Sequence, residues 1–344
     1  MKNASLYPLT FRPLLKERIW GGRNLERLYD KPLPPEKPIG ESWEISDRPG
    51  GDVSVIANGP LAGKDLHWLM QQHRADLLGN TATAATPSQT AGTAADRFPL
   101  LIKILDARDT LSLQVHPPPD RAVELKGEPK TELWYVAHAE PGAELFVGLK
   151  RGVTRQQFEK KIASGTVAEC FHSIKVKAGD TMFLPSGRVH ALGGGLVIFE
   201  IQQNSDTTYR VFDWNRVGLD GKPRELHVEQ SLASINFNDF EPGLVDSPFV
   251  ESGPARKRLL VRDPLFTVEL VELTANETLP LPAGKSAIVG LLEGSLTIDG
   301  NNISVALVQG GFCLVPAASL HASVRTSLPP SRFLLIQPGN LPRS

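Results

Sequence analysis

The sequence predicts a mainly β protein with two jelly-roll-like barrels and a few accessory helices. Many short apolar runs are separated by turn-forming residues, and the 344-residue chain contains 30 glycines and 28 prolines. A weak internal repeat supports two barrels, because the segment Gly179 through His190 is echoed by Gly310 through His321. We expect the first barrel to bind a metal ion and the second to lack one.

Size and charge narrow the function classes. The chain is 41% hydrophobic, which suffices for a large core, and its formal net charge of -1 argues against a broad nucleic-acid surface. It has no run of 18 apolar residues and no signal-peptide core, so we expect no membrane association. Cys170 and Cys313 are far apart and lack CxxC spacing. A disulfide framework is therefore not expected, and a cytoplasmic location fits best.

The first part of the chain should combine short strands with one helix. Asp65 is an N-cap candidate for a helix over residues 65–72. Residues 79–96 are dominated by Thr, Ala, Gly, Pro and Ser, which predicts a flexible surface loop. The nearly continuous apolar run at 98–105 predicts a buried strand, and a second strand at 111–116 ends at three prolines.

Further strands and two helices follow. We expect strands at 132–138, 144–148, 196–203 and 209–213, and helices at 154–163 and 228–235. Thr154 should cap the first of these helices. From about residue 250 the chain reads as a separable β unit, which places one predicted domain at 1–245 and a second at 246–344.

Two short motifs hold the candidate metal ligands. Gln114 and His116 are two residues apart, so on a strand they share one face. Glu132 lies in another strand-like run, and His190 ends a run that contains turn-forming glycines and a proline. Two imidazoles and one carboxylate form a recurring ligand set for a catalytic divalent metal with open coordination positions. His116, Glu132 and His190 are therefore the predicted ligands.

The spacing around His190 resembles a known fold family. Gly179, five residues, then Pro185-x-Gly187-x-x-His190 is similar to the second conserved motif of cupin barrels. The C-terminal copy is degenerate, since Ala318 replaces the inner glycine, and Ser286 and Ile288 stand where paired histidines would be. We expect a second barrel without metal that serves stability, association or covering of the first barrel.

Several longer runs together resemble the type I mannose-6-phosphate isomerases, especially their short bacterial form. These runs lie at 17–22, 39–44, 111–117, 130–135, 185–191, 202–210 and 224–227. The resemblance implies interconversion of mannose 6-phosphate and fructose 6-phosphate with one zinc ion per chain. It also implies that His116, Glu132 and His190 hold the zinc and that Gln114 is a weaker fourth ligand. Gln114 can instead hydrogen-bond to a ligand, and other divalent metals can use the same residues.

The resemblance also points to residues that act on the substrate. Lys130 is expected to bind substrate or transfer a proton, and a role as a structural charge partner stays open. Arg210 is expected to grip phosphate or steady an enediolate through its planar fork. Ser112 is a candidate phosphate contact, although its hydroxyl can equally bond to backbone. We expect the carboxylates Glu41, Glu44 and Asp206 to be structural.

Two other functions remain possible from the sequence. An iron oxygenase uses the same two-histidine, one-carboxylate set, and a non-catalytic sugar-phosphate sensor could keep the ligands. The cations Lys130 and Arg210 favour the isomerase over an oxygenase of apolar substrates. The expected partner is a small sugar phosphate, with no nucleic acid and no membrane, and the chain is expected to be a monomer or a homodimer.

Overall fold

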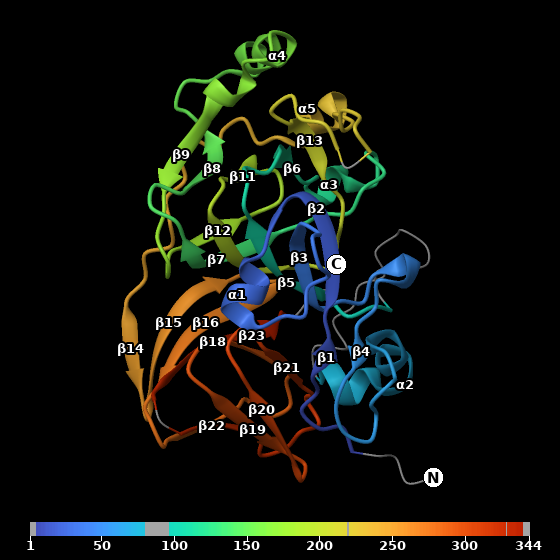
Figure 1. Ribbon diagram of the computed structural model, residues 1–344, viewed down its shortest axis with the longest axis vertical. Coiled ribbons are helices and arrows are strands. Elements are labelled where there is room, and N and C mark those ends of the chain that lie inside the picture. Colours follow the sequence, from blue (N-terminus) through green and yellow to red (C-terminus); the bar gives the residue numbers. More distant parts are fainter. Residues whose placement is uncertain (1–4, 80–95, 219, 328, 340–344) are drawn as a thin grey trace. The chain divides into compact units, whose positions relative to one another are not determined.

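The computed structural model describes residues 5–79, 96–218, 220–327 and 329–339 (Figure 1). The predicted loop at 79–96 lies outside these ranges except for its two end residues. The chain forms two compact units. Unit 1 comprises Met1–Leu14, Trp43–Leu101 and Asp246–Ser344, and unit 2 comprises Leu15–Ser42 and Ile102–Val245. Within the described residues, no helix is long and apolar enough to cross a membrane.

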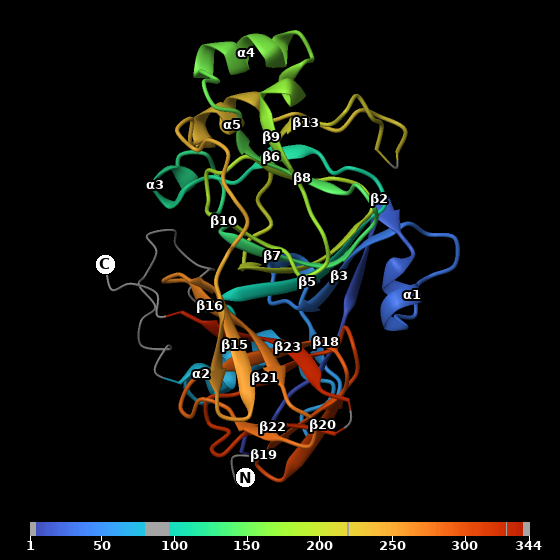
Figure 2. The same cartoon turned by 90° about the vertical axis from the view of Figure 1, so that its left-hand side faces the viewer.

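Unit 2 holds a five-stranded sheet and most of a six-stranded sheet, and the two sheets face each other (Figure 2). The six-stranded sheet has the order β10-β7-β12-β5-β2-β3, and the five-stranded sheet has the order β13-β6-β11-β8-β9. The strands of the first sheet are β2 Leu14–Gly22, β3 Ile39–Ile45, β5 Leu100–Ala107, β7 Glu132–Ala139, β10 Thr181–Leu184 and β12 Leu196–Gln203. Those of the second are β6 Leu113–Val115, β8 Glu144–Leu149, β9 Phe171–Lys175, β11 His190–Leu192 and β13 Tyr209–Phe212.

Successive side chains on these strands point to opposite faces of the sheets, so the apolar residues form two separate clusters. Trp134 and Val136 of β7 pack inside the barrel with Leu145 and Val147 of β8. The opposite face of the five-stranded sheet is covered by helices α4 Arg155–Ala163 and α5 Val228–Ser234. The remaining helical segments of this unit are α1 Asn24–Tyr29, α3 Pro119–Ala122 and the 3₁₀ turn η3 Val167–Cys170.

Unit 1 contains the second barrel. Its sheets have the orders β14-β15-β16-β23-β18-β21 and β17-β22-β19-β20, and both contribute to one apolar core. The strands are β14 Phe249–Ser252, β15 Ala255–Arg262, β16 Phe266–Leu273, β17 Thr278–Pro280, β18 Ala287–Glu293, β19 Leu296–Gly300, β20 Ile303–Leu307, β21 Phe312–Val315, β22 Ser323–Thr326 and β23 Ser331–Pro338. The fold is thus mainly β and cupin-like, as predicted.

N-terminal residues complete unit 1. It includes strands β1 Phe11–Arg12 and β4 Val55–Ile56, the 3₁₀ turn η1 Pro49–Gly51 and helix α2 Leu66–Leu78. Leu9 exchanges two backbone hydrogen bonds of 2.8 Å with Leu314, which adds the N-terminal segment to the second barrel. This compact unit therefore takes in residues that the sequence places in the first predicted domain, and the domain boundary at residue 245 stays a prediction.

The predicted helices and their caps are confirmed. Asp65 precedes α2, and its side chain accepts a hydrogen bond of 2.7 Å from the Trp68 backbone N–H. Thr154 precedes α4 and forms a capping box with Gln157, so two of the otherwise unpaired N–H groups are satisfied. Both cysteines are free and buried.

Candidate active site

Strand register brings the predicted ligands together inside unit 2. Leu113 and Val115 pack into the outer apolar cluster, so Gln114 and His116 face the barrel interior. His190 is the direct partner of Gln114 across the β11–β6 pair. Glu132 begins β7 on the opposite sheet, where it pairs with Leu184 of β10 and Gln202 of β12. His116 thus directly follows β6, while Glu132 begins β7 and His190 begins β11.

The turn before β11 positions His190. Gly187 has a φ of 90°, a conformation that favours glycine, and its N–H donates a 2.9 Å hydrogen bond to the His116 carbonyl. Arg188 forms two hydrogen bonds of 2.8 Å with the Asp239 carboxylate. The turn is thus tied both to the first ligand motif and to a later loop of the same unit.

The three ligand side chains converge on one buried point. His116 Nε2 lies 3.5 Å from Glu132 Oε1, and His190 Nε2 lies 3.4 Å from Glu132 Oε2. One ligand atom from each residue falls within 4.8 Å of the others. Each imidazole donates its Nδ1–H to a backbone carbonyl, that of Thr207 at 2.8 Å for His116 and that of Arg188 at 2.9 Å for His190. Both Nε2 lone pairs are thereby directed at the carboxylate.

This arrangement fits a bound cation. His116 Nε2 and both oxygens of Glu132 are buried without a well-formed hydrogen bond. Burial lowers the pKa of His190 to about 3, and it also lowers the pKa of His116, so both rings are neutral. Burial opposes ionisation of Glu132, but the Lys130 ammonium lowers its pKa well below the ordinary value. Two neutral imidazole nitrogens that face one carboxylate form a donor set that suits a divalent metal.

Gln114 and Lys130 border the cluster. Gln114 Nε2 lies 3.3 Å from His190 Nε2, so the amide reaches the ligand group. Lys130 Nζ lies 2.7 Å from Glu132 Oε1. Burial alone would lower the pKa of Lys130, but the carboxylates of Glu132, Glu200 and Asp206 raise it above the ordinary lysine value. Without metal, Lys130 is therefore a cation rather than a base.

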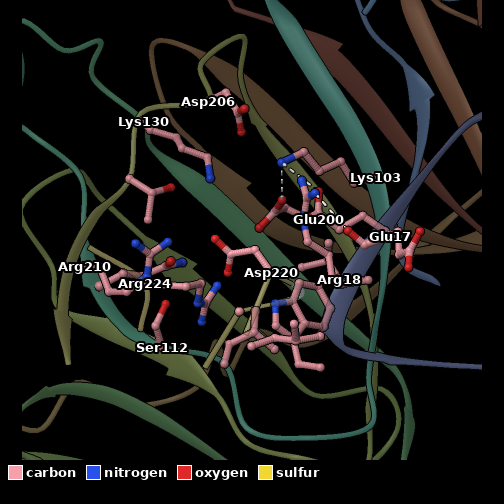
Figure 3. Close-up of a pocket in the computed structure, with 18 residues that line it drawn as sticks. Glu17, Arg18, Lys103, Ser112, Lys130, Glu200, Asp206, Arg210, Asp220 and Arg224 are labelled. Atoms are coloured by element: carbon pink, nitrogen blue, oxygen red, sulfur yellow. Dashed lines mark hydrogen bonds and ion pairs between the residues drawn. The ribbon is translucent and has the colours of Figure 1, made fainter. Parts of the chain in front are cut away.

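A pocket of about 600 Å³ opens beside this cluster, entirely within unit 2 (Figure 3). Its lining includes the predicted residues Ser112, Gln114, Lys130 and Arg210. The other lining residues are Glu17, Arg18, Ile19, Trp20, Glu41, Lys103, Leu105, Leu111, Glu200, Asp206, Thr208, Gly218, Asp220 and Arg224. The volume lies within the range of small-molecule binding sites.

Polar groups gather on two sides of the pocket. Figure 3 shows Arg210, Arg224 and Ser112 on one side and Lys103, Arg18 and Glu17 on the other. Arg210 is half-buried, and its Nη1 donates a 2.7 Å hydrogen bond to the Glu225 carbonyl. Its buried Nε has no hydrogen-bond partner. The Arg210 guanidinium is therefore available to an anion in the pocket.

Sequence reasoning missed an ionic group on the pocket wall. Glu200 is buried, accepts a 2.8 Å hydrogen bond from Trp134 Nε1, and lies 3.4 Å from Lys103 Nζ. Lys103 also lies 3.8 Å from Glu41, which binds Arg18 at 2.7 Å. Burial and then Glu132 raise the pKa of Glu200. The available signal was a single charge within an otherwise apolar strand: Glu200 in Leu-Val-Ile-Phe-Glu-Ile and Lys103 in Leu-Leu-Ile-Lys-Ile-Leu.

The predicted structural carboxylates differ in position. Glu41 and Asp206 both line the pocket, whereas Glu44 is buried and does not line it. In unit 1, His321 is exposed and has a φ of 61°, and Ser286 and Ile288 are buried on or beside β18. Within the described ranges, His116, Glu132 and His190 are the one metal-compatible cluster found.

The chain is similar to known proteins over most of its length. The family model for the catalytic domain of type I phosphomannose isomerase matches residues 9–128. A mannose-6-phosphate isomerase from Streptococcus mutans is 36% identical over 310 residues, which covers 90% of this chain and 92% of that protein. A probable mannose-6-phosphate isomerase from Bacillus subtilis is 36% identical and covers 90% and 94%. The crystal structure of a Bacillus subtilis mannose 6-phosphate isomerase superposes with a TM-score of 0.83 at 30% identity, covering 96% of this chain and 99% of that one.

Proposed function

The chain belongs to the type I phosphomannose isomerases, and from that premise we propose that its unit 2 pocket interconverts mannose 6-phosphate and fructose 6-phosphate. The enzyme is a metal-dependent aldose–ketose isomerase. The proposed metal is one zinc ion per chain, held by His116, Glu132 and His190, with the Gln114 side-chain oxygen as a weaker fourth ligand. Cobalt, manganese or iron could use the same donors.

One observation carries the proposal. The ligand triad adjoins a pocket that also presents Lys130 and Arg210, so a cation, a proton-carrying group and an anion anchor meet in one cavity. An iron oxygenase of apolar substrates has no use for those two cations. Family membership favours the isomerase over both that oxygenase and a non-catalytic sugar-phosphate sensor.

The reaction moves a proton between C1 and C2 of the open-chain sugar through an enediol(ate). A bound divalent metal supplies Lewis-acid polarisation of the sugar oxygens. The protein must contribute a group that carries the proton, a site for developing negative charge, and an anchor that keeps the reacting carbons beside these groups.

Glu200 and Lys130 are the proposed proton carriers. Both are buried in the pocket wall, and Glu200 is oriented by Trp134 and Lys103. A carboxyl group with a raised pKa can exchange a proton with carbon-bound positions more readily near neutral pH. Lys130 is positively charged in this structure, so it is suited to donating a proton or to stabilising an enediolate oxygen.

Arg210 and Ser112 are the proposed phosphate contacts. The unpaired Nε of Arg210 can donate to a phosphate oxygen, and the Ser112 side chain lines the same side of the pocket. Anchoring the phosphate there would place the other end of the sugar toward Gln114, Lys130 and the ligand triad. Water would be excluded from that end by the buried barrel interior.

Coupled-assay turnover of mannose 6-phosphate tests the function. Activity should vanish on chelation, return with zinc, and fall strongly in a folded Arg210→Ala variant. His190→Ala should lose both bound zinc and activity, whereas the matched control His321→Ala should keep one zinc per chain and full activity. Metal content is measured independently by elemental analysis. A folded, zinc-loaded wild-type protein without turnover would refute the assignment.

Oligomeric state and location are separate proposals. We propose a monomer or homodimer, which light scattering after size-exclusion chromatography distinguishes. A cytoplasmic location is also proposed, and the two free cysteines are compatible with a reducing compartment.

A further inference from the structure

We propose that Arg224, locked by Asp213, is a second phosphate-binding residue that sets the preference for phosphorylated over unphosphorylated sugar. The inference rests on the proposed function, because it takes the phosphate of the substrate as the ligand. Arg224 follows β13 in a segment beyond residues 9–128, the part that the family model matches. It lines the pocket on the same side as Arg210 and Ser112 (Figure 3).

Arg224 is held in a fixed orientation. Its Nε donates to Asp213 Oδ2 at 2.7 Å and its Nη2 donates to Asp213 Oδ1 at 2.5 Å. Asp213 is buried, and this two-point contact fixes the plane of the guanidinium group. A hydrogen bond of 2.6 Å from the Gly218 N–H to the Lys222 carbonyl closes the loop that leads to Arg224. The guanidinium is therefore preorganised rather than freely mobile.

Around Arg224, the arginines outnumber the buried carboxylates. Arg210, Arg216 and Arg224 surround the single buried carboxylate of Asp213, which pairs with both Arg216 and Arg224. Burial and then the charge of Arg224 lower the pKa of Arg210, so the two cations raise each other's energy. The other nearby acids, Asp220 and Glu225, are exposed, and Asp220 Oδ1 accepts a hydrogen bond from the Lys222 backbone N–H. A phosphate dianion would relieve the repulsion between the two guanidinium groups.

The geometry separates binding from chemistry. Phosphate offers several acceptor oxygens, and two guanidinium groups with one hydroxyl match them well. The groups proposed to handle protons, Lys130 and Glu200, are separate residues of the pocket lining. Arg224 should therefore act on substrate affinity more than on turnover, and its contribution should disappear for a sugar without phosphate.

The test compares Arg224→Ala and Arg224→Lys with Arg216→Ala. Arg216 is the matched control, because it also pairs with Asp213 but does not line the pocket. Four quantities are measured on each folded, zinc-loaded enzyme: KM and kcat for mannose 6-phosphate, the inhibition constant of inorganic phosphate, and kcat/KM for unphosphorylated mannose. Thermal unfolding checks that each variant is folded.

Arg224→Ala should raise KM and the phosphate inhibition constant by about 10- to 100-fold, with kcat changed less than about 3-fold. Its kcat/KM for mannose should stay near the wild-type value. Arg224→Lys should recover part of the loss, and Arg216→Ala should change KM less than about 3-fold. An unchanged KM and inhibition constant in folded Arg224→Ala would overturn the inference, as would an equal loss with mannose. If wild type lacks turnover yet phosphate binding, followed by calorimetry, still depends on Arg224, the proposed function fails and the phosphate site stands.

Discussion

At the scale of single residues, the site depends on buried polar atoms that have no hydrogen-bond partner within the described part of the protein. The ligand imidazoles each give their Nδ1–H to a backbone carbonyl and turn Nε2 toward Glu132. The two Nε2 atoms are thereby left free to bind a cation, which would stabilise the folded state. The same reasoning applies to Arg210, whose buried Nε has no hydrogen-bond partner and could donate to an anion.

Glu200 offers a sharp test of proton transfer. Glu200→Gln keeps an oxygen that can accept from Trp134 Nε1 but removes the ionisable group. We expect kcat to fall by about 10²- to 10⁴-fold with little change in KM. Exchange of substrate hydrogen with solvent deuterium should fall in parallel. Glu41→Gln, a pocket carboxylate bound to Arg18, is the control and should lose far less. A Glu200→Gln enzyme with near-normal kcat would assign proton transfer to another group.

Glu272 in unit 1 predicts a pH-dependent part of the stability. Burial opposes its ionisation, but hydrogen bonds from Arg256 and Arg332 lower its pKa below the ordinary value. Because the folded-state pKa is lower than the unfolded one of about 4.3, this contribution exists above that pH and is lost as pH falls through the folded-state value.

Unfolding midpoints at several pH values check this expectation. Glu272→Gln should be less stable than wild type at pH 7, and the difference should shrink as the pH approaches 3. The exposed Glu277→Gln, in the turn between β16 and β17, should match wild type throughout. A difference for Glu272→Gln that stays constant with pH would contradict the assigned ion pairs.

At the scale of elements, backbone conformation decides where the ligands lie. Gly179 and Gly187 both have φ near 90°, at 91° and 90°. A Cβ at Gly179 would meet no atom within 4 Å, whereas one at Gly187 would lie 3.2 Å from the Ser234 carbonyl oxygen. The two glycines thus share the same backbone requirement but differ in packing and in distance from the ligand loop.

Alanine at each glycine separates strain from site geometry. Both variants should lose about 1–2 kcal/mol of folding free energy, because L-residues disfavour this conformation. Only Gly187→Ala should also weaken zinc binding, since its turn leads directly into His190. Denaturant titrations and competitive zinc titrations give the two quantities. Equal zinc affinities in the two variants would show that this turn does not control the position of His190.

At the scale of the whole molecule, all proposed ligands and pocket residues belong to unit 2. A metal that binds the folded state alone stabilises it by about 2.7 kcal/mol at a free concentration 100 times Kd. Chelation should therefore lower the unfolding temperature and increase hydrogen exchange in β6, β7 and β11. Strands β18 and β23 of unit 1 should keep their protection. Equal loss of protection in both units would show that the metal also governs the folding of unit 1.

The sequence by itself determined the β-rich, two-barrel fold, the helix caps and the residues of the proposed ligand triad. These features are local: Asp65 and Thr154 bond to N–H groups three residues ahead, and Gln114 and His116 share a face through strand periodicity. The spacing around His190 encodes a turn in the same way, through Gly187.

Only the tertiary structure decided which distant charges meet. Glu200 and Lys103 appear in sequence as isolated charges in apolar strands, and their pairing follows from the positions of β12 and β5 in one sheet. Arg224 lines the pocket because its hydrogen bond to Asp213 holds the loop that carries it against the barrel. Two charged side chains interact when they lie close together in space, and that distance is set by strand order and by the paths of the loops. A linear pattern of residue types does not contain this distance.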